Sequence, residues 1–235
     1  MNDARDEILA RVRTSLKSAY LPGARASLPA HIQAPAGDPA ALVEAFSREA
    51  TALGVHLHRC ETPAQATETI LKVLGEIGGT EILAWADDAL PLGELGAAVR
   101  SEELALNAAK GWRVLDPNVP GDGPARREKL AELGRASAGL TGALAGLADT
   151  GTLVLHGGAG RPRLASLLPP VHIAMLRASH IYPTMAAFLA AHAEAVHAGS
   201  NLVFITGASR TSDIELTLTL GVHGPKILHI AVLLF

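Results

Sequence analysis

The sequence contains little cysteine, few aromatic side chains and no long apolar run, and each shortage excludes a class of protein. A single cysteine, Cys60, among 235 residues excludes an internal disulfide, a cysteine-based zinc site and an iron–sulfur cluster held by this chain alone. Aromatic residues make up 3%, too few for the stacking platforms that bind single-stranded nucleic acid. The longest stretch without Asp, Glu, Lys or Arg, 178–193, is too short and too polar to span a bilayer.

Charge of either sign is also in short supply. The net charge is −3 with a pI near 6.4, which argues against a dedicated nucleic-acid-binding protein. Hydrophobic residues make up 49%, so a disordered chain is excluded and a sizeable core is expected. No apolar segment of a signal peptide follows Met1, and the lone cysteine suits a reducing compartment. We therefore expect a soluble cytoplasmic protein.

Strand-like and helix-like segments alternate from residue 38 to the end. Strands are predicted at 54–60, 81–86, 112–115, 152–155, 171–176, 201–206 and 227–233. Helices are predicted at 39–53, 63–77, 125–136, 184–197 and 213–220. This alternation predicts an α/β domain over 38–235, in which a mostly parallel sheet is flanked by helices.

A separate N-terminal segment, 1–37, precedes this domain. Its first twenty residues predict an amphipathic helix with Ile8, Val12 and Leu16 on one face. A linker rich in proline and glycine follows over 21–37. The helix is either a solvated element that docks on the body or an arm for an oligomer or a partner.

The segment 201–229 carries the most chemistry. A strand ends there in a glycine turn at Gly207, and a polar group follows, consisting of Thr206, Ser209, Arg210 and Thr211. Ser212 and Glu215 form a capping box, which predicts a helix directly after the polar group. Backbone N–H groups, hydroxyls and a guanidinium at a helix N-terminus bind phosphate or carboxylate. Ligands of parallel sheets bind at the carboxyl edge. We expect an anion site here; the alternative is a turn that caps its own polar groups.

Two further residues of this segment are candidates for proton transfer. Asp213 lies in the first turn of the predicted helix, where it would cap the helix, orient Arg210 or act as a base. His223 lies between glycines, where it is either a proton carrier or a turn residue bonded to the backbone.

A second polar turn, Thr150-Gly151-Thr152, precedes a strand and forms either another wall of the pocket or a tight turn. The glycine loop that follows His156 ends in Arg161 and Arg163, which suit an acidic ligand or are merely exposed. His172 points either into the core or towards the site. No P-loop, GxGxxG or GxSxG motif is present.

Metal binding is not predicted. His56 and His58 share one face of a strand, but no third ligand follows them at a suitable spacing.

Four ordered motifs together resemble the LUD domain of the lactate utilization protein C family over about residues 40–235. They are Ala148–Leu155, Ser166–Ala174, Ile205–Glu215 and Leu220–Pro225. Two positions depart from the family pattern: Asp149 replaces the expected Glu, and Ala208-Ser-Arg-Thr-Ser212 replaces Pro-Ser-Arg-Thr-Ala. Both departures keep the charge and hydroxyl chemistry.

The resemblance implies a fold similar to the superfamily of ribose-phosphate isomerase, glucosamine-phosphate deaminase and CoA transferase. It also implies a role in oxidising L-lactate to pyruvate with two partner proteins that carry iron–sulfur clusters, and no cofactor bound by this chain. Two other functions stay open. One is a stand-alone enzyme acting on a phosphorylated or CoA-linked small molecule, and the other is a non-catalytic assembly or regulatory subunit.

Overall fold

The computed structural model describes residues 3–18, 37–100, 112–196, 199–212 and 218–235, in two compact units, Met1–Ile32 and Gln33–Phe235. The described part of the first unit is helix α1 (Asp3–Ser18). Its side chains Ile8, Val12 and Leu16 are all exposed, and the predicted N-terminal helix is confirmed.

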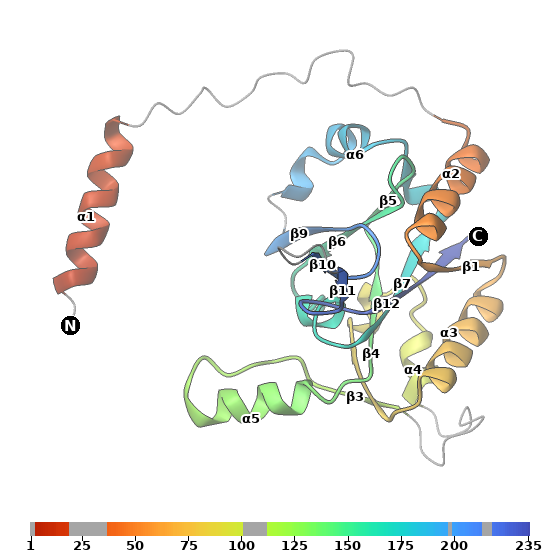
Figure 1. The fold of residues 1–235 in the computed structure, drawn as a ribbon, viewed down its shortest axis with the longest axis horizontal. Coiled ribbons are helices and arrows are strands. Elements are labelled where there is room, and N and C mark those ends of the chain that lie inside the picture. Colours follow the sequence, from red (N-terminus) through yellow and green to blue (C-terminus); the bar gives the residue numbers. More distant parts are fainter. Residues whose placement is uncertain (1–2, 19–36, 101–111, 197–198, 213–217) are drawn as a thin grey trace. The chain divides into compact units, whose positions relative to one another are not determined.

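The second unit is built on a six-stranded sheet in which every pair of neighbours is parallel (Figure 1). The strands, in spatial order, are β1 (His56–Cys60), β12 (Ile227–Leu233), β7 (Val171–Arg177), β4 (Ala138–Gly142), β2 (Glu81–Ala84) and β3 (Arg113–Val114). The central strand β7 is buried over 171–176, as expected for a parallel strand covered on both faces. The predicted mostly parallel sheet is confirmed.

Helices flank this sheet, as predicted. They include α2 (Pro39–Ala52), α3 (Pro63–Ile77) and α4 (Leu95–Arg100), while a further helix, α5 (Gly123–Leu133), buries only Leu133. Helix α3 packs against β1 and β12 (Figure 1). Thr62 caps its N-terminus, because the Thr62 hydroxyl accepts a hydrogen bond from the Gln65 backbone N–H at 3.2 Å. No helix of the described residues is long and apolar enough to cross a membrane.

A second sheet of four strands lies beside the first. In spatial order they are β8 (Ile181–Tyr182), β5 (Ala145–Leu147), β6 (Thr152–Gly157) and β9 (Asn201–Ile205). Strand β6 pairs antiparallel with both β5 and β9. Helix α6 (Met185–Ala191) packs on β5 and β8, and its Phe188 joins a small core with Leu147 and Val154. Short 3-10 helices complete the unit: η2 (Asp87–Ala89), η4 (Arg163–Ser166), η5 (Ala178–His180) and η6 (Ala193–Val196).

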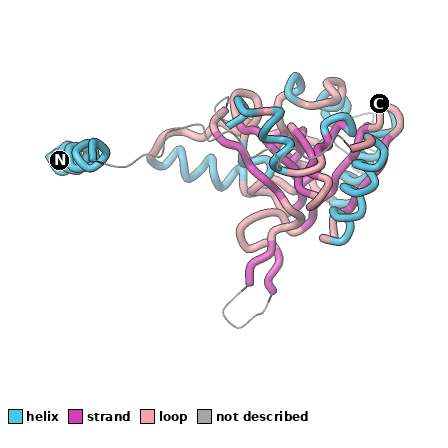
Figure 2. Tube along the Cα trace, turned by 90° about the horizontal axis from the view of Figure 1, so that it is seen from above, coloured by secondary structure: helices cyan, strands magenta, loops and turns pink. Residues whose placement is uncertain are grey.

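The helix predicted at 213–220 is wrong over 218–220, which form a strand, while 213–217 lie outside the described residues. The chain instead forms an antiparallel pair, β10 (Arg210–Ser212) and β11 (Leu218–Leu220), in which Arg210 lies opposite Leu220. Figure 2 shows these two strands projecting from the rest of the unit. Leucine and threonine alternate over 216–220, and this period of two favours a strand over the helix that the capping motif suggested. Asp213 lies outside the described residues.

Candidate functional site

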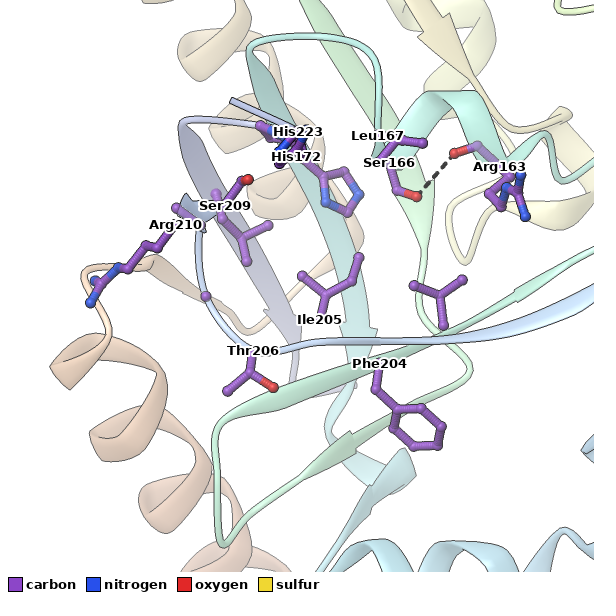
Figure 3. Close-up of a pocket in the computed structure, with 16 residues that line it drawn as sticks. Arg163, Ser166, Leu167, His172, Phe204, Ile205, Thr206, Ser209, Arg210 and His223 are labelled. Atoms are coloured by element: carbon purple, nitrogen blue, oxygen red, sulfur yellow. Dashed lines mark hydrogen bonds between the residues drawn. The ribbon is translucent and has the colours of Figure 1, made fainter. Parts of the chain in front are cut away.

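A cavity of about 340 Å³ lies where the two sheets meet (Figure 3). Apolar and polar side chains share its lining. The lining residues are Arg163, Ser166, Leu167, His172, Val203, Phe204, Ile205, Thr206, Gly207, Ala208, Ser209, Arg210, His223, Gly224, Pro225 and Leu228. A mostly apolar cavity of this size with a few convergent polar groups is typical of a small-molecule site.

The parallel sheet contributes to the cavity from the amino ends of its strands. His172 and Leu228 are the second residues of β7 and β12, and they lie opposite each other in the sheet. The expectation that the site lies at the carboxyl edge of the parallel sheet is therefore wrong. The glycine turn instead follows β9, which belongs to the antiparallel sheet and approaches from the other side.

Backbone hydrogen bonds hold three loops together around the cavity. The Ser209 N–H donates to the Pro225 carbonyl at 2.9 Å, and the Gly221 N–H donates to the Ser209 carbonyl at 2.9 Å. The Lys226 N–H donates to the Pro170 carbonyl at 2.8 Å. The turn after β9, the turn before β12 and the segment before β7 therefore form one connected wall.

Gly207 makes the turn that the sequence predicts. Its φ is +78°, a conformation that residues with a Cβ rarely adopt. A Cβ at this position would lie 3.2 Å from the Leu53 Cβ. Glycine is therefore favoured by the backbone angle, and the close approach to the end of α2 leaves little room for a larger residue.

The two predicted polar walls meet through a chain of hydroxyl groups. Thr206 Oγ1 lies 2.9 Å from Thr152 Oγ1, which lies 2.7 Å from Thr150 Oγ1. The Thr150 hydroxyl donates to the Asp149 carboxylate at 3.3 Å. In Figure 3, however, the Thr206 side chain points away from the side of β9 on which Ile205 and Ser209 lie. The chain thus joins β6 to β9, and the Thr206 hydroxyl is not directed at the cavity centre.

Gly151 also lies outside the cavity lining. It is buried, and a Cβ there would collide with the Ala50 backbone nitrogen of α2. Its turn therefore packs on a helix.

The two arginines that line the cavity differ in their contacts. The Arg210 guanidinium donates to the carbonyl of Leu53, the residue that caps the carboxyl end of α2. It points away from the cavity (Figure 3). Arg163, in η4, is the other cationic side chain in the lining. A guanidinium at a helix C-terminus satisfies a free carbonyl, so the contact of Arg210 is structural in this conformation.

Of the remaining predicted site residues, one lines the cavity and another does not. His223 lines the cavity and is exposed, close to Ser209 in Figure 3. Thr211 belongs to β10, where it lies opposite Thr219, and is not a lining residue.

His172 forms the buried floor of the cavity. The residue is 1% exposed, and its Nε2 lies 2.9 Å from the hydroxyl of Thr141 in β4. Burial lowers the pKa of His172 to about 4, because an imidazolium loses its hydration in such a place. The ring is therefore neutral at physiological pH.

A third histidine joins His56 and His58, contrary to what their spacing in the sequence suggested. His229 of β12 stacks on His56, and its Nδ1 lies 3.1 Å from His58 Nε2. Burial and the two neighbouring histidines lower the pKa of His229 to about 4. The rings of His58 and His229 are within 5° of parallel, and the facing nitrogens bond to each other. Among the described residues, no group of three or more His, Cys, Asp or Glu side chains is placed to hold a metal ion.

A family model described as the LUD domain matches residues 43–233. The chain belongs to the LUD domain family. This LUD domain protein is 34% identical to "Lactate utilization protein C" of Geobacillus sp. over 176 residues, which are 73% of the chain and 70% of the relative. It is 32% identical to the protein of the same name from Exiguobacterium sp. over 188 residues, 78% of the chain and 74% of the relative.

A crystal structure of a DUF162 family protein from Deinococcus radiodurans has the same fold. The TM-score is 0.56 at 24% identity, and the match covers 84% of this chain and 99% of that chain. It supports the α/β fold of this LUD domain.

Sequence reasoning missed Ser166 as a lining residue of the LUD domain cavity and left the places of Arg163 and His172 open. Ser166 and His172 both lie in the motif Ser166–Ala174, which carried the family resemblance. The presence of both polar residues in a family motif could therefore have indicated that they belong to a site. That they line one cavity with Ser209 depends on the tertiary arrangement of β7, η4 and the turn after β9, which no local pattern contains.

Proposed function

We propose that this chain takes part in L-lactate utilization, in which L-lactate is oxidised to pyruvate together with iron–sulfur partner proteins in the cytoplasm. The observation that carries the proposal is the family membership, with relatives named lactate utilization protein C matching more than 70% of the chain. The oxidation removes an electron pair from the substrate, and side chains alone cannot accept it. Because Cys60 is the only cysteine and is buried, the partners would supply the electron carriers.

The cavity is the proposed site for the small acid. Its polar lining includes the hydroxyls of Ser166 and Ser209, the imidazole of His223 and the guanidinium of Arg163. Hydroxyls and a guanidinium together bind carboxylates. His223 lies at the exposed side of the cavity, where it can exchange a proton with solvent. We assign carboxylate binding to Arg163 and Ser209, and proton transfer to His223.

Growth on L-lactate as the sole carbon source tests this function in a strain deleted for the gene. The strain is complemented with wild type, Arg163→Ala or Arg161→Ala at equal expression. Arg161 is two residues away in the chain and does not line the cavity, so its variant is the matched control. We expect wild type and Arg161→Ala to restore growth, and Arg163→Ala to restore it poorly.

Two other results would contradict parts of the proposal. Full rescue by Arg163→Ala, and also by Ser209→Ala and His223→Ala, would make the cavity dispensable and favour an assembly subunit. Normal growth of the deleted strain on L-lactate, with no second copy of the gene, would overturn the lactate role itself.

The size of the cavity favours a second candidate. A volume of about 340 Å³ exceeds what a molecule as small as lactate fills, so it also admits a small phosphorylated acid. Turnover of such a compound by the purified chain without partner proteins would establish this stand-alone activity.

A further inference from the structure

One ring nitrogen of His172, at the floor of the cavity, has no hydrogen-bond partner among the described residues. His172 bonds through Nε2 to Thr141, while no partner is recorded for its Nδ1 in the part of the chain that the structure describes. The ring projects from β7 towards the space between Ser209, Ile205 and Ser166 (Figure 3). A ring nitrogen that lines a cavity and has no protein partner is available to bond to a molecule in that cavity.

The neighbouring strand shapes the cavity around this ring. Gly139 of β4 lies opposite His172 in the sheet, and a Cβ there would collide with the Ala165 carbonyl of η4. Glycine therefore lets η4 approach the sheet closely. That approach brings η4, with Arg163 and Ser166, to the cavity that His172 lines, so the floor and one wall of the cavity are fixed by backbone packing.

The bond between Thr141 and His172 determines which ring nitrogen carries the proton. Thr141 is fully buried, and its hydroxyl has no other hydrogen-bond acceptor among the described residues. If Nε2 carried the proton, it would donate to Thr141, and the Thr141 proton would be buried without an acceptor. If Thr141 donates to Nε2 instead, the Thr141 proton has its acceptor, and the ring proton is on the side of the ring that lines the cavity. The ring proton then lies on Nδ1.

We propose that the Nδ1–H of neutral His172 is the hydrogen-bond donor that holds an oxygen of the ligand, either a carboxylate or a carbonyl oxygen of a small acid. This inference rests on the proposed function, since it takes the cavity as the acid site. The low pKa of His172 (about 4) keeps the ring uncharged, so it donates without competing for the proton that the reaction releases. Such a preorganised donor stabilises negative charge that grows on an oxygen.

The tautomer can be read directly by nitrogen-15 NMR of the ligand-free protein, because protonated and unprotonated ring nitrogens differ widely in chemical shift. We expect the proton of His172 on Nδ1 in the wild type and in Thr141→Ser, which keeps the hydroxyl. In Thr141→Val, which removes it, the Nε2–H form should gain population. A wild-type ring protonated on Nε2 would overturn the inference without any ligand being involved.

Binding of pyruvate tests the contact itself. His172→Asn places an amide N–H close to the position of Nδ1, whereas His172→Phe fills the space and offers no donor. We expect His172→Phe to bind pyruvate about tenfold more weakly than wild type, as for a lost buried hydrogen bond. His172→Asn should retain most of the affinity, and the Nδ1 signal of wild type should shift when pyruvate is added.

Failure of the inference and failure of the proposed function give different results. Equal pyruvate affinity in wild type and a folded His172→Phe, with weaker binding by Arg163→Ala, would overturn the role of His172 and leave the acid site standing. Absence of binding of both pyruvate and L-lactate to wild type would overturn the acid site, and the ligand contact of His172 with it. Thermal unfolding of each variant identifies a substitution that fails to fold.

Discussion

The buried imidazole of His172 makes the stability of the protein depend on pH. Its folded pKa is about 4 against an ordinary value of 6.5, so the unfolded chain takes up a proton at a higher pH than the folded chain. The stability that the protein gains from keeping His172 neutral is fully present above about pH 6.5 and is lost as the pH falls towards about 4. It amounts to about 3 kcal/mol.

Urea unfolding at a series of pH values measures this effect. The free energy of unfolding of the wild type should fall steadily over that range, with His229 adding to the loss, because its pKa is also lowered to about 4. His172→Asn, which cannot titrate, should show a shallower fall. Equal slopes in both proteins would mean that His172 is charged or absent from the titration.

Arg210 is predicted to stabilise the fold rather than the ligand. Its guanidinium bonds to the Leu53 carbonyl at the end of α2, so Arg210→Gln should lower the free energy of unfolding by about 1 kcal/mol. Calorimetric titration with pyruvate should give nearly the wild-type affinity for this variant, while Arg163→Gln binds more weakly. A loss of binding in Arg210→Gln alone would show that the guanidinium turns into the cavity when the acid is present.

At the scale of elements, the turn before β6 is fixed by its contact with α2. Gly151 has a φ of +62° and leaves no room for a Cβ beside the Ala50 backbone. Gly151→Ala should therefore lower the free energy of unfolding by at least about 2 kcal/mol. Gly75, within α3, has nothing within 4 Å of a Cβ, and Gly75→Ala should raise stability by about 0.5–1 kcal/mol. Thermal unfolding of the two variants checks both signs.

The same elements show why local patterns predicted some of the fold and not the rest. Strand β7 is rich in bulky apolar residues, and its sequence alone identified it. Strands β4 (AGLTG) and β5 (AGL) contain mainly glycine, alanine and leucine, and they become strands only because β7 and β6 pair with them. Strands β6 and β9 were predicted, but their antiparallel pairing in a separate sheet depends on partners distant in the chain.

At the scale of the whole molecule, the second unit contains its own core. The buried apolar side chains of the described residues begin at Val43. A chain lacking residues 1–32 should therefore unfold within about 2 °C of the full chain. Poor rescue of growth on L-lactate by this folded, shortened chain would show that the N-terminal unit is an arm for a partner. Full rescue would restrict the function to the second unit, and loss of folding would contradict the division.

The candidate site was predicted only where a local backbone signal existed. Gly207 and its turn followed from sequence, because a glycine after a strand before polar residues has few other uses. The directions of Arg210 and Thr206 did not, since a side chain at a turn can face either side of a strand. His172 could not be placed, because its neighbours Ser166 and Ser209 come from other parts of the chain.

The most direct test of the account is a crystal structure of the protein grown with saturating pyruvate. We expect the acid in the cavity, with one oxygen within hydrogen-bond distance of His172 Nδ1 and its carboxylate near Ser209 or Arg163. Pyruvate bound elsewhere, or a cavity that holds only water while the protein remains active in lactate growth, would contradict the central claim that this cavity is the working site.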